Sequence, residues 1–97
     1  MNQDIIYDVY LMPGMAANPK IFEFIKLPKN FKTHHLEWQM PYKNELMSEY
    51  ALRISRLIKG NNIVLIGVSF GGIIVQEISK IIKCKKVIII SSVKSNK

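Results

Sequence analysis

The sequence predicts an α/β fold: a mostly parallel sheet with helices on both faces. Two observations lead to this prediction. Short apolar runs rich in β-branched residues alternate with longer segments of helical periodicity, in the order β-α-β-α-β-α-β. No repeat, low-complexity tract or linker divides the 97 residues, so residues 1–97 are expected to belong to a single domain. Helices between successive strands give right-handed crossovers and therefore parallel neighbouring strands.

Four segments are predicted as strands. Residues 5–12 are mostly apolar and aromatic, and they end at the turn signal Pro13-Gly14. Residues 33–38 are predicted as a second strand, which ends at Gln39-Met40-Pro41. Residues 63–66 are apolar, β-branched and bounded by turn-forming residues, as expected of a strand that is covered on both faces. Residues 87–90 form the last strand, and the chain after them is polar.

Three helices are predicted between these strands. The first covers residues 19–27, with Asn18 as its N-cap and proline at its first position. The second covers residues 44–59, where the apolar residues recur on one helical face, and Gly60 stops it. The third covers residues 72–83 and again carries its isoleucines on one face.

Composition excludes several classes of function. The net charge is +7, but the lysines are scattered, and no aromatic residues alternate with the one group of them at residues 80–86. We therefore expect no nucleic-acid partner. The single cysteine, Cys84, excludes an internal disulfide and any multi-cysteine metal site. No bound metal or cofactor is predicted.

The sequence shows neither a signal peptide nor a membrane span. Residues 1–4 lack a basic segment followed by an apolar one. The longest weakly polar run, residues 63–78, falls short of the ~20 apolar residues that a membrane helix needs. We expect a cytoplasmic protein.

The most informative stretch follows the third predicted strand, where Gly67, Ser69 and Gly71 form the pattern G-x-S-x-G. A serine exposed at the end of a sheet requires the chain to reverse from strand to helix within about one residue, which strains the backbone at the serine. Side chains two residues before and after the serine would collide across this turn, so both positions favour glycine. The start of the helix offers backbone N–H groups and a partial positive charge to a developing anion.

This motif, the strand–helix alternation and the loop after the first strand together resemble the α/β-hydrolase fold superfamily. The resemblance covers nearly all of the chain but only the front part of that fold. It implies that Ser69 is a nucleophile and that the backbone N–H of Phe70 is one oxyanion donor. The second donor would be the Met15 N–H, in the loop Pro13-Gly14-Met15. The family's usual histidine in this loop is replaced by Pro13, which the chemistry permits because the donor is a backbone group.

The resemblance also implies a spatial strand order of 33–38, 5–12, 63–66 and 87–90. In this family an acid and then a histidine follow later strands, and this chain contains neither of those strands. His34 and His35 are expected to lie at the start of the second strand, too far from Ser69 to act as its base.

We therefore predict that the chain is the N-terminal portion of an α/β-fold serine hydrolase, truncated at its C-terminus. The parent protein would attack a small-molecule ester, thioester or similar acyl substrate through Ser69 and release the acyl group to water. The alternative is a non-catalytic or degenerate α/β module that acts through protein association at the exposed sheet edge beside residues 87–90. Substrate identity, acyltransferase or other chemistry on the same fold, and oligomeric state remain open.

Overall fold

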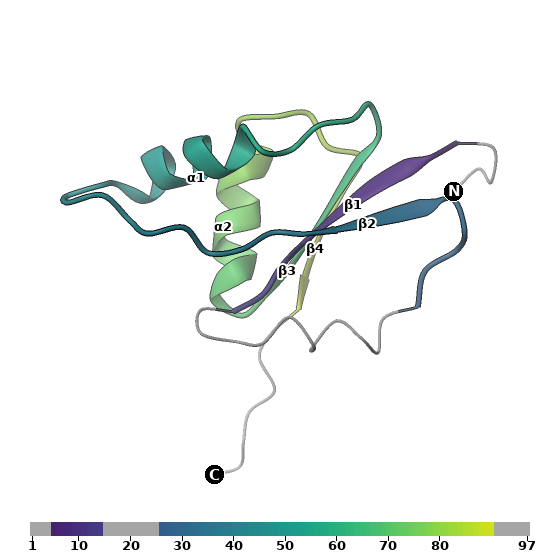
Figure 1. Ribbon diagram of the computed structural model, residues 1–97, viewed down its shortest axis with the longest axis horizontal. Coiled ribbons are helices and arrows are strands. Elements are labelled where there is room, and N and C mark those ends of the chain that lie inside the picture. Colours follow the sequence, from purple (N-terminus) through teal and green to yellow (C-terminus); the bar gives the residue numbers. More distant parts are fainter. Residues whose placement is uncertain (1–4, 15–25, 91–97) are drawn as a thin grey trace, which may run out of the picture.

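The computed structural model describes residues 5–14 and 26–90. In this part of the chain four strands form one parallel sheet, and two helices pack against it (Figure 1). The predicted α/β class is therefore confirmed. The elements, in chain order, are β1 (Tyr7–Met12), β2 (Phe31–His35), α1 (Met47–Ser55), β3 (Ile63–Val68), α2 (Phe70–Ser79) and β4 (Lys86–Ile90).

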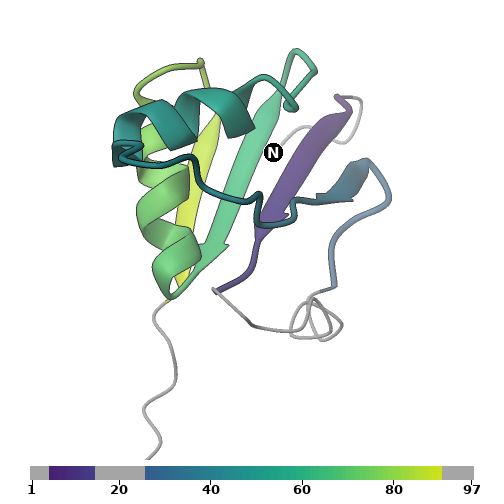
Figure 2. The ribbon, with the colours of Figure 1, turned by 60° about the vertical axis from the view of Figure 1, so that its left-hand side comes forward.

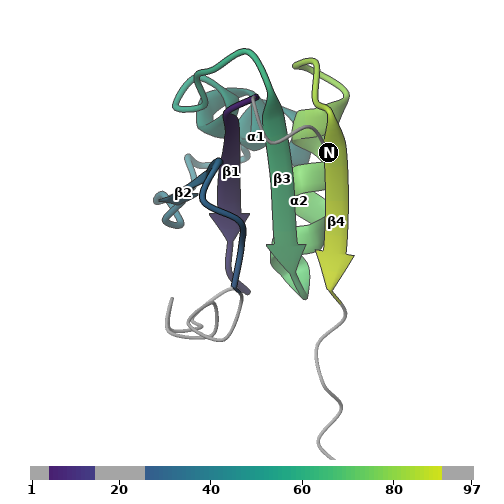
Figure 3. The same ribbon diagram turned by 90° about the vertical axis from the view of Figure 1, so that its right-hand side faces the viewer.

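The strands lie in the order β2-β1-β3-β4, which is the order that the family resemblance implied (Figure 3). Strand β1 is central because it pairs with β2 on one side and with β3 on the other. Tyr10 of β1, for example, is in register with His34 of β2 and with Leu65 of β3. Strand β3 is buried along its full length. The sheet therefore holds the carboxyl end of β3, where Ser69 follows, between β1 and β4.

Both described helices lie on the same face of the sheet, as Figures 2 and 3 both show. The helix predicted over residues 19–27 lies almost entirely outside the described residues, and the predicted helical cover of the sheet's other face stays a prediction. Its last two residues, 26 and 27, are described and are not helical. On that opposite face, Val9, Leu11 and Val64 are nonetheless almost fully buried.

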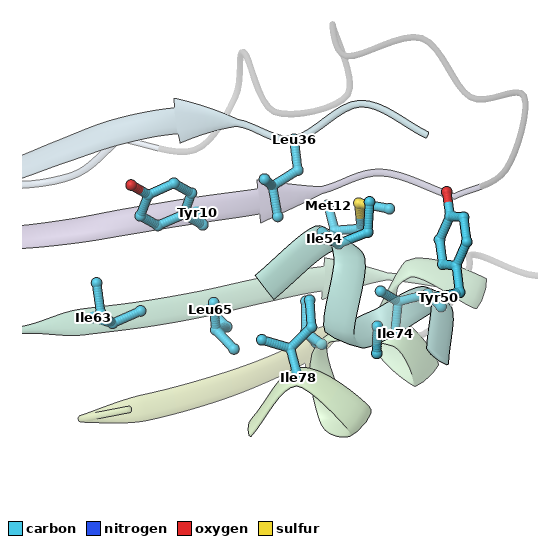
Figure 4. Close-up of a cluster of buried hydrophobic side chains, with 11 residues drawn as sticks. Tyr10, Met12, Leu36, Tyr50, Ile54, Ile63, Leu65, Ile74 and Ile78 are labelled. Carbon is cyan, nitrogen blue, oxygen red and sulfur yellow. The ribbon is translucent and has the colours of Figure 1, made fainter. Parts of the chain in front are cut away.

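The core between the sheet and the helices is built from a regular face of each element (Figure 4). Helix α1 contributes Tyr50, Ala51 and Ile54, and α2 contributes Ile74, Val75 and Ile78, in each case at the spacing that places residues on one helical face. The strands contribute alternate residues, among them Tyr10, Met12, Ile63 and Leu65. Because α1 and α2 also contact each other, this core fixes the start of α2 against the sheet.

Several predicted element ends were wrong. The helix predicted over residues 44–59 covers only Met47–Ser55. Asn44 has a φ of 61°, which a helix does not accommodate, and Glu45 is used in an ion pair with Arg53. The last predicted helix, residues 72–83, begins earlier, at Phe70, and ends at Ser79.

The strand ends also shift. Strand β2 covers Phe31–His35 instead of residues 33–38. It starts earlier because Phe31 pairs with Tyr7 and its ring packs on the Tyr7 ring. It ends earlier because the chain turns over the end of β1, where the Trp38 indole N–H donates a hydrogen bond to the Pro13 carbonyl at 3.0 Å.

Candidate active site

Ser69 occupies the single residue between the end of β3 and the start of α2. Its backbone has φ 57° and ψ −124°. Among residues 5–14 and 26–90, the only non-glycine residues with a positive φ are Asn44 and Ser69. Such a conformation costs on the order of 1–3 kcal/mol and persists only where the surrounding structure enforces it. The Ser69 side chain is exposed and makes no capping hydrogen bond to α2, which leaves the hydroxyl available for chemistry.

The glycines around Ser69 allow this turn because other backbone passes directly against them. A Cβ atom at Gly67 would overlap the carbonyl group of Gly71. A Cβ atom at Gly71 would overlap the carbonyl oxygen of Met12 and lie 2.6 Å from that of Pro13. The steric reason that the sequence suggested for Gly67 therefore holds. For Gly71 the obstacle is instead the end of β1, which brings Pro13-Gly14 against the first turn of α2.

Two backbone groups define the surroundings of the serine. The Ser69 N–H donates to the Ile90 carbonyl at 2.8 Å, which ties the turn to the last residue of β4. Phe70 is the first residue of α2, so its N–H has no partner within the helix and lies in the positive end of the helix dipole. The predicted role of Phe70 as an oxyanion donor stays a prediction. Met15, the other predicted donor, lies outside the described residues, and its role stays a prediction.

The reason that the sequence offered for excluding the two histidines was wrong in part. His34 and His35 lie at the carboxyl end of β2, not at its start. The histidines are still remote from Ser69, because β1 separates β2 from β3. His34 is level with Leu65, four residues before Ser69 and two strands away, which gives roughly 16 Å. The corresponding estimate for His35 is roughly 14 Å.

The acidic residues of the sheet and of α2 have partners of their own. Asp8 contacts His34, with 2.9 Å between Oδ1 and Nε2, and the His34 ring stacks on Tyr10. Glu77 pairs with Lys80 on the surface of α2. Within residues 5–14 and 26–90, no three or more histidine, cysteine, aspartate or glutamate side chains gather as a metal site would require.

An apolar pocket of about 460 Å³ adjoins the elbow, and the sequence did not indicate it. Its walls include Trp38, Met40, Leu46, Met47, Tyr50 and Phe70, and we call it the Trp38 pocket. The Trp38 ring is stacked on the Phe70 ring, with 5.5 Å between centroids and 6° between planes, and also on the Tyr50 ring at 5.9 Å. The one hint of this pocket in the sequence is the single tryptophan, Trp38, shortly before Met40-Pro41. That hint does not show which aromatic rings Trp38 contacts.

The rim of the Trp38 pocket is held by polar contacts. The Tyr50 hydroxyl accepts from the Gln39 N–H at 2.7 Å and donates to the Gln39 carbonyl at 2.9 Å. Arg53 donates two hydrogen bonds to the Glu45 carboxylate, at 2.6 and 2.8 Å, and lies over the Tyr42 ring. The hydrogen bonds from Arg53 lower the pKa of Glu45 to about 2. Segment 38–46 is therefore fixed to α1.

In the part of the chain that the structure describes, no helix has both the length and the apolar character needed to cross a bilayer. Comparisons with protein-family models, with curated proteins and with solved structures found no match to this chain. The case for catalysis therefore rests on the residues and geometry around Ser69.

Proposed function

We propose that Ser69 is the nucleophile of an α/β-type serine hydrolase that acts on an ester, thioester or similar acyl substrate. The observation that carries the proposal is the backbone of Ser69, held at φ 57° and ψ −124° between a buried strand and a helix. A strained serine with an exposed hydroxyl, enforced by close backbone contacts at Gly67 and Gly71, is costly to retain for packing alone.

The proposed reaction proceeds by acyl transfer to the serine. The Ser69 hydroxyl oxygen bonds to the carbonyl carbon while its proton passes to a general base. The carbonyl oxygen becomes an oxyanion, which the Phe70 N–H stabilises; one such donor contributes about 3–4 kcal/mol in comparable sites. The leaving group then departs with that proton, and water hydrolyses the acyl-serine.

The base is the missing part of this mechanism within the described residues. His34 and His35 are too distant, and the family resemblance implies a histidine and an acid from later strands. We therefore place both groups outside residues 1–97. Reading the coding sequence beyond Lys97 tests this directly. An open frame that supplies an acid and then a histidine supports the proposal, and a stop codon directly after Lys97 contradicts it.

A fluorophosphonate probe tests the nucleophile itself in the full-length protein. We expect labelling at Ser69, none in Ser69→Ala, and unchanged labelling in the control Ser79→Ala, because the Ser79 hydroxyl already donates to the Gln76 carbonyl at 2.6 Å. Labelling that persists in Ser69→Ala would contradict the proposal.

One observation favours the alternative, a non-catalytic α/β module. Within the described residues β4 has no neighbouring strand on its outer side, and Ile89 and Ile90 are 45% and 38% exposed. An open apolar edge of this kind can pair with another chain. The same probe separates the two functions, because a non-catalytic module would leave Ser69 unlabelled.

A further inference from the structure

The Trp38 pocket offers a ligand almost nothing to hydrogen-bond. Its wall is mostly aromatic rings, methionines and aliphatic side chains, and Gln39 and Glu45 are its polar residues. Most of the polar groups around it have protein partners. The Trp38 indole N–H donates to Pro13, the Tyr50 hydroxyl is bonded to the Gln39 backbone, and the Glu45 carboxylate is held by Arg53. A charged or strongly polar group would lose its water here without compensation. The pocket therefore suits an apolar, uncharged group.

The Trp38 pocket also shares one residue with the turn at the serine. Phe70 belongs to both features: its ring forms part of the pocket wall, and its N–H starts α2 directly after Ser69. If a substrate carbonyl binds at the Phe70 N–H, the chain attached to that carbonyl can therefore reach into the pocket.

The pocket is preformed and of suitable size. Its volume of about 460 Å³ lies within the range of ~300–1,000 Å³ that small-molecule sites occupy. The stacked rings of Tyr50, Trp38 and Phe70 fix one side. Met40 and Leu46, which are 83% and 63% exposed, leave the mouth open. Methionine side chains adapt their shape to apolar ligands of different lengths.

From these observations we infer that the Trp38 pocket binds the apolar chain of the substrate, so that esters with a medium-length alkyl or an aryl acyl group are preferred over acetyl or charged acyl esters. This inference rests on the proposed function for its catalytic meaning, but the binding itself does not need an active serine. Binding can therefore be tested separately from catalysis.

Trp38 makes that test direct, because it is the single tryptophan among the 97 residues and it lines the pocket. The full-length protein carrying Ser69→Ala is titrated with straight-chain alcohols from butanol to decanol, and with decanol carrying a terminal bromine, which quenches indole fluorescence on contact. If the full-length protein contains further tryptophans, they are first replaced by phenylalanine. We expect affinity to rise about fourfold for each methylene that enters the pocket, and the brominated decanol to quench Trp38.

Two substitutions on α1 provide the matched comparison. Met47 lines the pocket and is 38% exposed, whereas Leu52 is 41% exposed and is not part of the pocket wall. Met47→Asp is expected to weaken decanol binding at least tenfold, and Leu52→Asp to leave it unchanged, with equal circular dichroism spectra confirming that both variants fold. Equal binding by the two variants, or no quenching by the brominated alcohol, would overturn the inference.

The outcomes for the pocket and for the serine are distinguishable. Decanol binding without fluorophosphonate labelling supports the pocket and contradicts the proposed hydrolase. Labelling whose rate does not depend on the alkyl length of the probe overturns the pocket inference and leaves Ser69 as the nucleophile.

Discussion

Replacing Gly71 by alanine should break the contact between the elbow and the end of β1. A Cβ atom at this position would lie 2.6 Å from the Pro13 carbonyl oxygen and 3.0 Å from the Met12 carbonyl carbon. Both atoms are backbone, and Met12 belongs to the central strand of the sheet, so neither can move without disturbing strand pairing. Overpacking costs typically 1–3 kcal/mol, and a rigid backbone obstacle places this substitution near the upper end, at about 3 kcal/mol.

Gly72→Ala is the matched control on the neighbouring residue. Its Cβ atom would meet Ile89 Cγ2 at 2.6 Å, and the next nearest atoms lie at 3.6 Å. The Ile89 side chain is 45% exposed and can adopt another rotamer. Alanine gains up to about 1 kcal/mol of helix propensity over glycine at either position, and at Gly72 this gain is enough to offset the rotamer change of an exposed side chain. We expect the free energy of unfolding of Gly72→Ala to stay within ~1 kcal/mol of the wild type.

Equilibrium urea unfolding, followed by far-ultraviolet circular dichroism, measures both substitutions. A loss of about 3 kcal/mol should lower the urea midpoint of Gly71→Ala by roughly 2 M, whereas the Gly72→Ala midpoint should barely move. Small domains have only ~5–15 kcal/mol of stability in total, so the Gly71 variant should be close to unfolding. Equal midpoints for the two variants would refute the reasoning, because they would show that the β1 backbone yields as readily as an exposed side chain.

Three further predictions concern other contacts. Arg53 holds the pKa of Glu45 at about 2, below its unfolded value of ~4.3. The stabilisation that this ion pair gives is therefore complete above pH ~5 and is lost as the pH falls toward 2. Glu45→Gln should flatten the decline of the urea midpoint over that range, and an unchanged slope would argue against the pair. The Tyr10 hydroxyl donates to the Lys59 carbonyl and accepts from the Lys59 N–H, both at 3.0 Å. Tyr10→Phe should therefore lower the free energy of unfolding by about 1 kcal/mol, measured by thermal unfolding. An unchanged free energy would show that water takes the place of the hydroxyl. Ser69→Gly should be about 1 kcal/mol more stable than Ser69→Ala, because glycine tolerates the positive φ; equal stability would mean that the turn is not strained.

Patterns close together in the sequence predicted much of this fold. The alternation of strands and helices was sufficient for the α/β class, and the family resemblance supplied the strand order, which the structure reproduces. The glycine spacing around Ser69 also predicted a strained turn, because the clash at Gly67 arises within five residues, whereas the clash at Gly71 comes from the end of β1. Local steric rules of this kind can be applied to a sequence directly.

Features that join distant segments were missed. The Trp38 pocket depends on stacking among Trp38, Tyr50 and Phe70, which belong to three separate segments. The early end of β2 depends on a hydrogen bond from Trp38 to Pro13, 25 residues earlier. Helix α1 starts late because Glu45 pairs with Arg53 instead of extending the helix. None of these contacts leaves a periodic pattern in the sequence.

The hydrogen bond from the Ser69 N–H to the Ile90 carbonyl has a consequence for the order of events during protein synthesis. Strand β1 is made first, and β2 and β3, which are made later, both pair with it in the folded sheet. Ser69 leaves the ribosome well before β4, and its backbone partner appears 21 residues later. We therefore expect the turn at Ser69 to gain this backbone support only after β4 has docked, and the site to mature late among the described parts of the sheet.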